Sequence, residues 1–307
     1  MVGLPAALIS RYERFSLYNS PYPAHDHRCA IDLYLEDPVA RSPVAGVVRE
    51  TRTVRAPTKP YAHDEEYLIL VDVDVAATGL EWDGGEDESD GNRGGSDVNA
   101  ADGLVARILH VEPSVSAGDE LDVGDPLGRL VRSGFFAPWV ANHIHLGFRR
   151  ASANHHRARG SLPLAVETDV TPLSWDGCGT VVETGETYVV LDDPIDRSGS
   201  GFVGIASDEG AVLDGGLAHY VAGGTLSSIP DGTELSLFGT HVGTVTDGDV
   251  PWADIDVFAN GERVTGLSLF ASQIEHGAKV VCPGHDFGVG DELELSIGTS
   301  EDPIRLG

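Results

Sequence analysis

Two histidines two residues apart, His143 and His145, are the side chains best placed for chemistry in the segment NHIHLGFR. Alternate side chains of a β-strand share a face, so both imidazoles would point away from Ile144 and Leu146. One ring could then bind a metal ion while the other stands beside a water on that metal. The alternative is two ordinary histidines on a polar sheet face, and the pattern alone does not exclude it.

The segments that must position these histidines consist of short apolar stretches separated by turn residues, a pattern typical of β-strands. His110 closes one of them, ARILH, and we expect it to share a strand face with Ala106 and Ile108. A Gly-Asp hairpin follows at 118–128, with the sequence GDELDVGDPLG. The strands expected before this hairpin cover residues 30–34, 44–54, 66–75 and 104–111.

The order of these motifs resembles the lysostaphin-type zinc metallopeptidases. That family has a strand ending in histidine, a hairpin of the form GDxVxxGxxIGxxG, and H-x-H near the end of the domain. Upstream, AIDLYLEDPVARSPVAGVV is similar to the family pattern GIDxxAPxGTPVxAxxDGxV and places Asp32 at its aspartate. The resemblance covers residues 25–150 and implies an all-β domain with the duplicated hybrid motif fold.

The resemblance also implies a role for each matching residue. His145 and Asp32 would bind zinc, and His143 would act as the general base or orient the water, helped by His110. Three protein ligands and a water make an open zinc site, which polarises a carbonyl and acidifies the water. The implied function is a zinc-dependent metallopeptidase or related amide hydrolase that acts on a peptide or protein.

The sequence departs from the family at the third metal ligand. The family has a histidine four residues before the aspartate, but this chain has Arg28, which stays protonated and cannot bind a metal. His25 and His27 are the available replacements, although both have the wrong parity for a regular strand facing Asp32. A loop or bulge could bring either one into place. Cys29 is a further possible ligand, although a small buried thiol is its commoner role.

The chain divides by composition into two β-rich parts. Residues 1–24 form a lead-in, 25–150 the peptidase-like domain, and 151–162 a polar connection. Residues 163–307 again show strands and turns, which predicts a second, sandwich-like β-domain without a catalytic motif. Within the first domain, residues 78–102 are rich in glycine and carboxylates and are expected to form an acidic loop.

Charge and composition narrow the partners and the location. The 307 residues carry 49 acidic and 20 basic side chains, a net charge of −29. No basic stripe is present for nucleic acid or an anionic membrane, so neither is expected as a partner. Such an acidic, lysine-poor surface suits molar salt, which favours an extreme halophile. The absence of a recognisable signal segment predicts the cytoplasm, and an odd number of cysteines implies no disulfide framework.

Two other functions are compatible with these residues. A binding or scaffold module could retain the peptidase fold with a degraded metal site, since Arg28 replaces a ligand. A swinging-arm carrier is the second, because the Gly-Asp hairpin also resembles lipoyl and biotinyl domains. Those carriers attach their cofactor to a lysine on a hairpin turn, and neither Lys59 nor Lys279 has that context.

Overall fold

The computed structural model describes residues 1–307 except 83, 85–102, 197–198, 200, 275–276 and 307. Its regular structure is almost entirely β, with short strands between glycine-rich and proline-rich turns, which confirms the predicted all-β, two-domain class. The helical elements are single turns: α1 (Ala6–Ile9), α2 (Val75–Thr78) and the 3₁₀ helix η1 (Asp26–Arg28).

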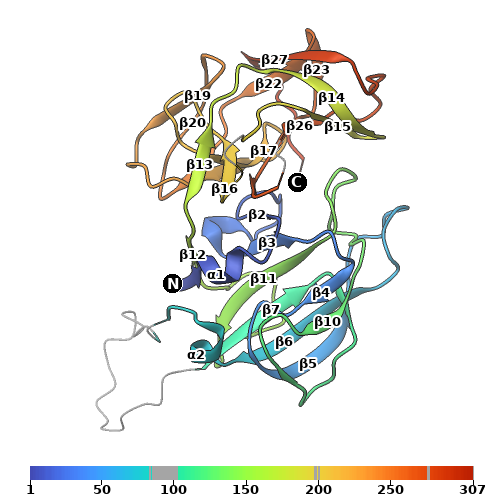
Figure 1. Cartoon of the computed structure of the whole chain (residues 1–307), viewed down its shortest axis with the longest axis vertical. Coiled ribbons are helices and arrows are strands. Elements are labelled where there is room, and N and C mark those ends of the chain that lie inside the picture. The colour runs from blue at the N-terminus through green and yellow to red at the C-terminus, as the bar shows by residue number, and fades with distance from the viewer. Residues whose placement is uncertain (83, 85–102, 197–198, 200, 275–276, 307) are drawn as a thin grey trace.

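Strands β1 to β12 belong to the first half of the chain and β13 to β27 to the second (Figure 1). The strands of the first half are β1 Val2–Pro5, β2 Arg14–Ser16, β3 Ile31–Tyr34, β4 Val39–Arg41, β5 Gly46–Val54, β6 Glu66–Val73, β7 Leu104–Leu109, β8 Val111–Pro113, β9 Glu120–Leu121, β10 Pro126–Leu130, β11 His143–Arg150 and β12 Leu164–Glu167. The strands of the second half are β13 Val170–Leu173, β14 Cys178–Gly185, β15 Tyr188–Leu191, β16 Phe202–Ile205, β17 Leu213–Leu217, β18 Ala222–Thr225, β19 Glu234–Leu237, β20 Thr240–Thr244, β21 Asp249–Pro251, β22 Ile255–Ala259, β23 Glu262–Val264, β24 Gly266–Leu269, β25 Ala271–Ser272, β26 Lys279–Val281 and β27 Glu292–Thr299.

One ten-stranded sheet carries the candidate site, with the order β13-β16-β25-β2-β3-β11-β7-β6-β5-β9. β11 runs antiparallel between β3 and β7, and pairs His145 with Asp32 on one side and Leu109 on the other. Because side chains alternate across a strand, Ile144 and Leu146 face the opposite side and enter the buried core of the first domain. The predicted division of the H-x-H segment into a polar and an apolar face is confirmed.

Residues 1–24, expected as a lead-in, form part of the first domain. Strand β1 pairs in parallel with β12, and β2 pairs with β3 in the main sheet. Leu4, Ile9 and Phe15 are fully buried in the same core as the strands of the first domain. The apolar residues of this segment therefore close the core that the sheet would otherwise leave open to water.

The expected acidic loop at 78–102 lies mostly outside the described residues. Its described beginning packs against the domain, since Thr78 ends α2, Leu80 is buried and Glu81 bridges to Gly3. The polar connection at 151–162 is also fastened to the sheet. Arg149 donates from its guanidinium to the carbonyl oxygens of Asn154, Arg157 and Arg159.

The two halves share the main sheet and a buried contact. Strands β13, β16 and β25 come from the second half, and β25 pairs with β2 of the first. Asp214 on β17 accepts hydrogen bonds from the Ser16 hydroxyl and the Leu17 amide, at 2.6 Å each. Lys279 on β26 donates to the carbonyl oxygen of Trp139, in the loop that leads to β11. The second half therefore contacts both segments that flank the candidate site.

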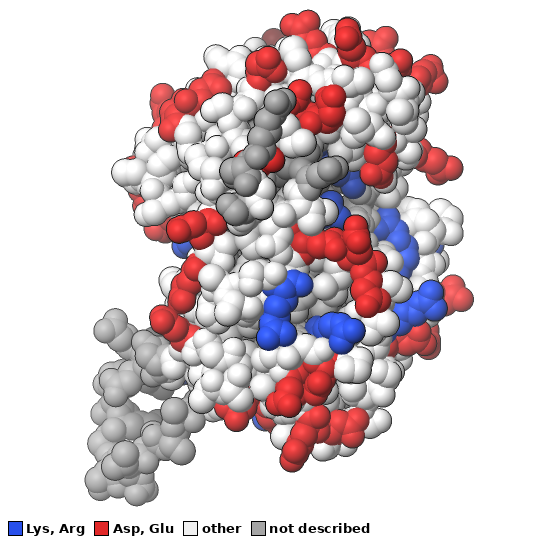
Figure 2. Space-filling view, in the orientation of Figure 1, with Lys and Arg blue, Asp and Glu red and all other residues white. Residues whose placement is uncertain are grey.

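The surface is rich in carboxylates, and the cysteines form no disulfide, as the composition predicts. Carboxylates are scattered over both domains on the face shown in Figure 2, and the fewer basic side chains lie mainly near its middle. Cys29, Cys178 and Cys282 are all free thiols. Among the described residues, no helix is long and apolar enough to cross a membrane.

Candidate metal centre

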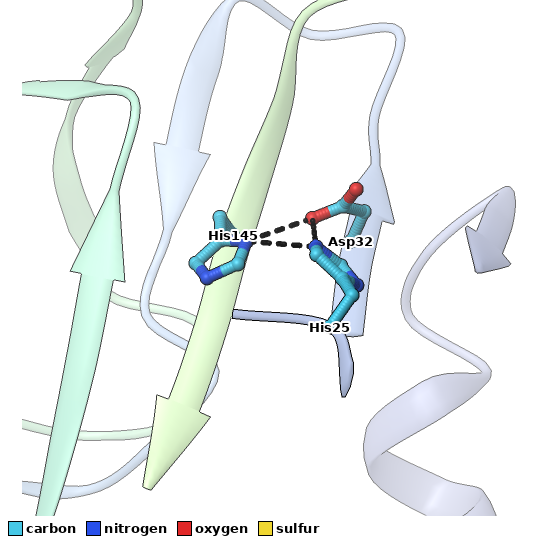
Figure 3. A group of neighbouring side chains, drawn as sticks. All are labelled: His25, Asp32 and His145. Atoms are coloured by element: carbon cyan, nitrogen blue, oxygen red, sulfur yellow. Dashed lines mark hydrogen bonds and ion pairs between the residues drawn. The ribbon is translucent and has the colours of Figure 1, made fainter. Parts of the chain in front are cut away.

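Asp32 and His145 lie side by side on one face of the main sheet, on neighbouring strands (Figure 3). They are directly paired residues of β3 and β11, and their side chains lie on the face turned away from the apolar core. The Asp32 Oδ1 atom lies 3.0 Å from His145 Nδ1. Neighbouring strands thus deliver two of the expected ligands without any irregularity in the backbone.

His25 reaches the same point from an irregular segment before β3. It directly precedes η1, in which His27 and Arg28 adopt left-handed backbone conformations with φ of 54° and 58°. This turn interrupts the alternation of side chains along the strand. The side chain of His25 therefore reaches Asp32, although His25 lies seven residues earlier. His25 Nε2 lies 3.2 Å from Asp32 Oδ1 and 3.1 Å from His145 Nδ1. Of the two histidines left open by the sequence, His25 is the one in the cluster.

The remaining polar residues of this segment turn elsewhere. The His27 side chain is 77% exposed and its Nδ1 lies 2.8 Å from an Asp249 carboxylate oxygen of the second domain. Arg28 donates to the carbonyl oxygen of Asp247. The Cys29 thiol donates to the carbonyl oxygen of His27. None of these three side chains belongs to the cluster formed by His25, Asp32 and His145.

The three clustered atoms fit a metal ion in spacing and donor type. They lie 3.0, 3.1 and 3.2 Å apart. Ligands bound to zinc at about 2.0–2.1 Å in tetrahedral directions are separated by about 3.3 Å. His25 Nδ1 lies 2.8 Å from the Leu17 carbonyl oxygen, which can only accept, so the proton occupies Nδ1 and Nε2 keeps a lone pair. The group could therefore hold a metal ion.

The electrostatics of the cluster favour the protonation states that a metal needs at Asp32 and His145, but not at His25. Burial raises the pKa of Asp32, but the charges of His143 and His25 outweigh it, and the pKa lies well below its usual value. Burial lowers the pKa of His145 to about 3, despite the Asp32 carboxylate. The pKa of His25 is raised, because Asp32 outweighs the effect of burial. Asp32 is thus charged and His145 neutral, and His25 would release its proton on metal binding.

His143 lies beside the cluster as the second imidazole of the H-x-H strand. Its Nε2 lies 3.3 Å from Asp32 Oδ1, and its Nδ1 lies 2.9 Å from the carbonyl oxygen of Ala141. Both oxygens can only accept hydrogen bonds. The ring therefore donates to both oxygens when both of its nitrogens carry a proton, and to one oxygen when a single nitrogen does. The rings of Tyr34 and Phe136 pack against it at centroid distances of 4.8 and 4.4 Å. His143 is therefore held rigidly with Nε2 toward the cluster.

His110 joins the site in a different way from the one expected. It lies between β7 and β8 with φ of 70°, so strand alternation ends there. Ala106 and Ile108 enter the apolar core, whereas the His110 ring lies on the opposite side, with centroids 5.3 Å from His143 and 5.7 Å from His145. The expectation that His110 shares a face with Ala106 and Ile108 is wrong, because the left-handed residue reverses the parity.

Glu66 and Ser133 fix the His110 ring. His110 Nδ1 lies 3.0 Å from Glu66 Oε2, and the His110 amide donates to Glu66 Oε1 at 3.0 Å. The Ser133 hydroxyl donates to the same carboxylate. Burial raises the pKa of Glu66, but these hydrogen bonds and the charge of His110 lower it by more. The pKa of Glu66 is therefore below its usual value. The carboxylate keeps the proton on Nδ1 and leaves His110 Nε2 as the acceptor.

A cavity of about 130 Å³ opens beside these side chains. His25, Asp32, His110, His143 and His145 all line it, together with mostly apolar residues. The second domain contributes Tyr220 to the wall. The residues that complete the lining are Asn19, Ser20, Pro21, Tyr22, Pro23, Ala24, Arg107, Leu109, Phe135, Phe136, Ala137, Val140 and Ala158.

The second domain also supports His25 through the backbone. Asp214 accepts hydrogen bonds from the amides of Leu17 and Tyr18, at 2.6 and 3.2 Å. The Leu17 carbonyl in turn holds the His25 ring. Sequence reasoning missed Asp214, Glu66, Tyr220 and Arg107, because each depends on a contact between distant segments and none belongs to a short motif.

The fold and the site together define an all-β, two-domain protein with a buried cluster of His25, Asp32 and His145 that could hold a metal ion. Family models match both halves of the chain. The N-terminal domain of the family described as domain of unknown function DUF8155 matches residues 3–166, and its C-terminal domain matches residues 171–298. The chain belongs to this family. No curated protein and no solved structure matches it.

Proposed function

We propose that this protein is a zinc-dependent metallopeptidase or a related amide hydrolase. The observation that carries the proposal is the convergence of His25, Asp32 and His145 at metal-ligand spacing in a cavity that also contains His143 and His110. Two histidines and one carboxylate form the ligand type of hydrolytic zinc enzymes. The order of motifs that resembles the lysostaphin-type peptidases supports the same reading.

The chain's own residues supply the acid and base groups that amide hydrolysis needs. A zinc ion held by His25, Asp32 and His145 would supply a Lewis acid that polarises the carbonyl and makes water more acidic. His143 can hold or release a proton at Nε2, next to Asp32. His110, with its Nδ1 fixed by Glu66, offers Nε2 to accept a proton or, when protonated, to donate to a carbonyl oxygen. The apolar wall limits competing water.

The first test is metal content. Protein purified in molar KCl should contain about one zinc per chain, and His145→Ala and Asp32→Ala should lose it. His156→Ala is the matched control, since His156 is exposed and contacts Arg52 and Glu50 rather than the cluster. Stoichiometric zinc in both cluster variants, or stoichiometric iron in place of zinc in the wild type, would contradict the proposal.

The second test separates catalysis from binding alone. His143→Gln keeps all three proposed ligands but removes the ring that carries the proton. It should retain zinc and lose hydrolysis of capped peptides by about 10²-fold or more. Hydrolysis that is unchanged in this variant would remove His143 from the mechanism. Zinc binding without hydrolysis of any tested peptide by the wild type would instead support a binding module.

A further inference from the structure

Arg107 is a buried guanidinium on the same sheet face as the metal cluster. It lies on β7 and pairs with Gly147, while its strand neighbour Leu109 pairs with His145. The residue is only 5% exposed and lines the cavity of the candidate site. Its Nε donates to the carbonyl oxygen of His155 in the connecting segment, at 2.7 Å. One nitrogen of the guanidinium is thus used to fix its position.

The two Nη nitrogens of Arg107 are available for a ligand. Within the described part of the chain they have no hydrogen-bond or ion-pair partner, and they are not among the fully enclosed unpartnered atoms. Burial and the neighbouring Arg149 lower the pKa of Arg107 to about 10, so it remains positively charged at neutral pH. A buried cation without a counter-ion is costly, and an anion delivered by a ligand would remove that cost.

Along the sheet, the backbone of Arg107 is offset from His145 by about two residues, which is the length of a short peptide. Gly147, opposite Arg107, lies two residues beyond His145, and two residues of a strand span about 7 Å. Consecutive Cα atoms of a peptide are about 3.8 Å apart. A carboxylate one or two residues from an amide at the cluster would therefore reach the guanidinium, whose Nη fork matches two carboxylate oxygens.

The apolar part of the cavity wall favours an apolar side chain on the ligand. Tyr22, Phe135, Phe136 and Val140 line the cavity, which measures about 130 Å³. A cavity of about 150 Å³ holds a benzene ring, so this one has room for a single side chain of leucine or phenylalanine size.

We propose that Arg107 binds a carboxylate of the substrate, so that the site takes a short peptide or acyl-amino acid with an apolar side chain and a nearby carboxylate. This inference rests on the proposed amide hydrolysis for its substrate, but the carboxylate subsite itself needs no metal. In a chain of net charge −29, the guanidinium of Arg107 would favour an anion over a neutral group at a buried position.

The test compares three ligands by NMR titration in molar KCl. They are N-acetyl-phenylalaninate, its neutral amide, and N-acetyl-phenylalanyl-glutamate with a capped main-chain carboxyl. Chelator-treated protein is used, so that no carboxylate–metal bond contributes. The free acid should bind at least about tenfold more tightly than the amide, as expected for a charge-assisted bidentate pair. Tighter binding of the glutamate ligand would identify a side-chain carboxylate as the natural group.

The variants assign the preference to Arg107. Arg107→Met should abolish the acid preference, and Arg107→Lys should retain part of it, since it keeps the charge but loses the fork. Arg157→Met is the matched control and should change nothing, since Arg157 is an exposed arginine near His155 in the connecting segment. Equal binding of acid and amide, no measurable binding of the acid, or a preference that survives in Arg107→Met would overturn the proposal. Zinc content measured in parallel reports separately on the proposed hydrolase.

Discussion

Replacement of Asp214 by asparagine tests how the second domain supports the metal cluster. Asp214 is fully buried, and its oxygens accept from the Ser16 hydroxyl and from the amides of Leu17 and Tyr18. An asparagine can place its oxygen toward both amides, but its NH₂ group then faces the Ser16 hydroxyl oxygen, which already accepts from the amides of Tyr18 and Asn19. The substitution therefore keeps both amide hydrogen bonds, loses the one from Ser16 by an amount that does not depend on pH, and removes the ionisable carboxyl.

Burial raises the pKa of Asp214 from 3.8 to about 7, against the hydrogen bonds from Ser16, Leu17 and Tyr18 that favour the charged form. Because the folded pKa lies above the unfolded one, the folded state holds the extra proton between about pH 4 and pH 7. The stability from this group is complete below about pH 4 and is lost as the pH rises to about 7. At 1.36 kcal/mol per pH unit, and with the group half titrated at pH 7, the loss between pH 5 and pH 7 is about 2 kcal/mol.

Urea unfolding in molar KCl, followed by tryptophan fluorescence, measures this effect. The stability of Asp214→Asn relative to the wild type should rise by about 2 kcal/mol from pH 5 to pH 7 and become constant above about pH 8. A stability difference that does not change with pH would show that the carboxyl titrates normally and would refute the reasoning. Asp214→Leu, which leaves the buried amide of Leu17 without its acceptor, should also weaken zinc binding by about 10-fold or more through Leu17 and His25.

Two further predictions concern the role of His27 and the dependence of stability on salt. His27→Ala should leave zinc affinity in a chelator competition unchanged, since His27 is exposed and pairs with Asp249; a loss above tenfold would return His27 to the ligand set. Lowering KCl from about 1 M to about 0.1 M lengthens the Debye length from about 3 to about 10 Å, so repulsion within a chain of net charge −29 should lower the melting temperature. A melting temperature that does not respond to KCl would mean that this repulsion contributes little.

Features set by strand alternation were accessible from the sequence. The pattern of NHIHLGFR predicted that His143 and His145 share a face. The family resemblance implied that His145 and Asp32 meet at one site, and the structure brings them together by direct pairing of β11 with β3. The all-β class followed from short apolar stretches between turns. These features depend on a period of two residues, which the sequence displays directly.

Features set by irregular backbone were not accessible in the same way. The left-handed backbone at His27 and Arg28 brings His25 into the cluster as its third member. The left-handed backbone at His110 places its ring at the site. Single non-glycine residues with positive φ follow from tertiary contacts and leave no periodic signal. Arg107 and Asp214 were missed because their partners lie far away in the sequence.

The pairing of β2 with β25 has a consequence for how this chain can be divided. β2 belongs to the first family segment and β25 to the second, yet they are adjacent strands of one sheet. Either segment produced alone would present an open strand edge, and such edges recruit other chains. The first segment alone would also lose the Asp214 contact behind His25. Gene truncation at the boundary between the two segments would therefore yield two aggregation-prone pieces rather than a minimal enzyme and a dispensable appendage.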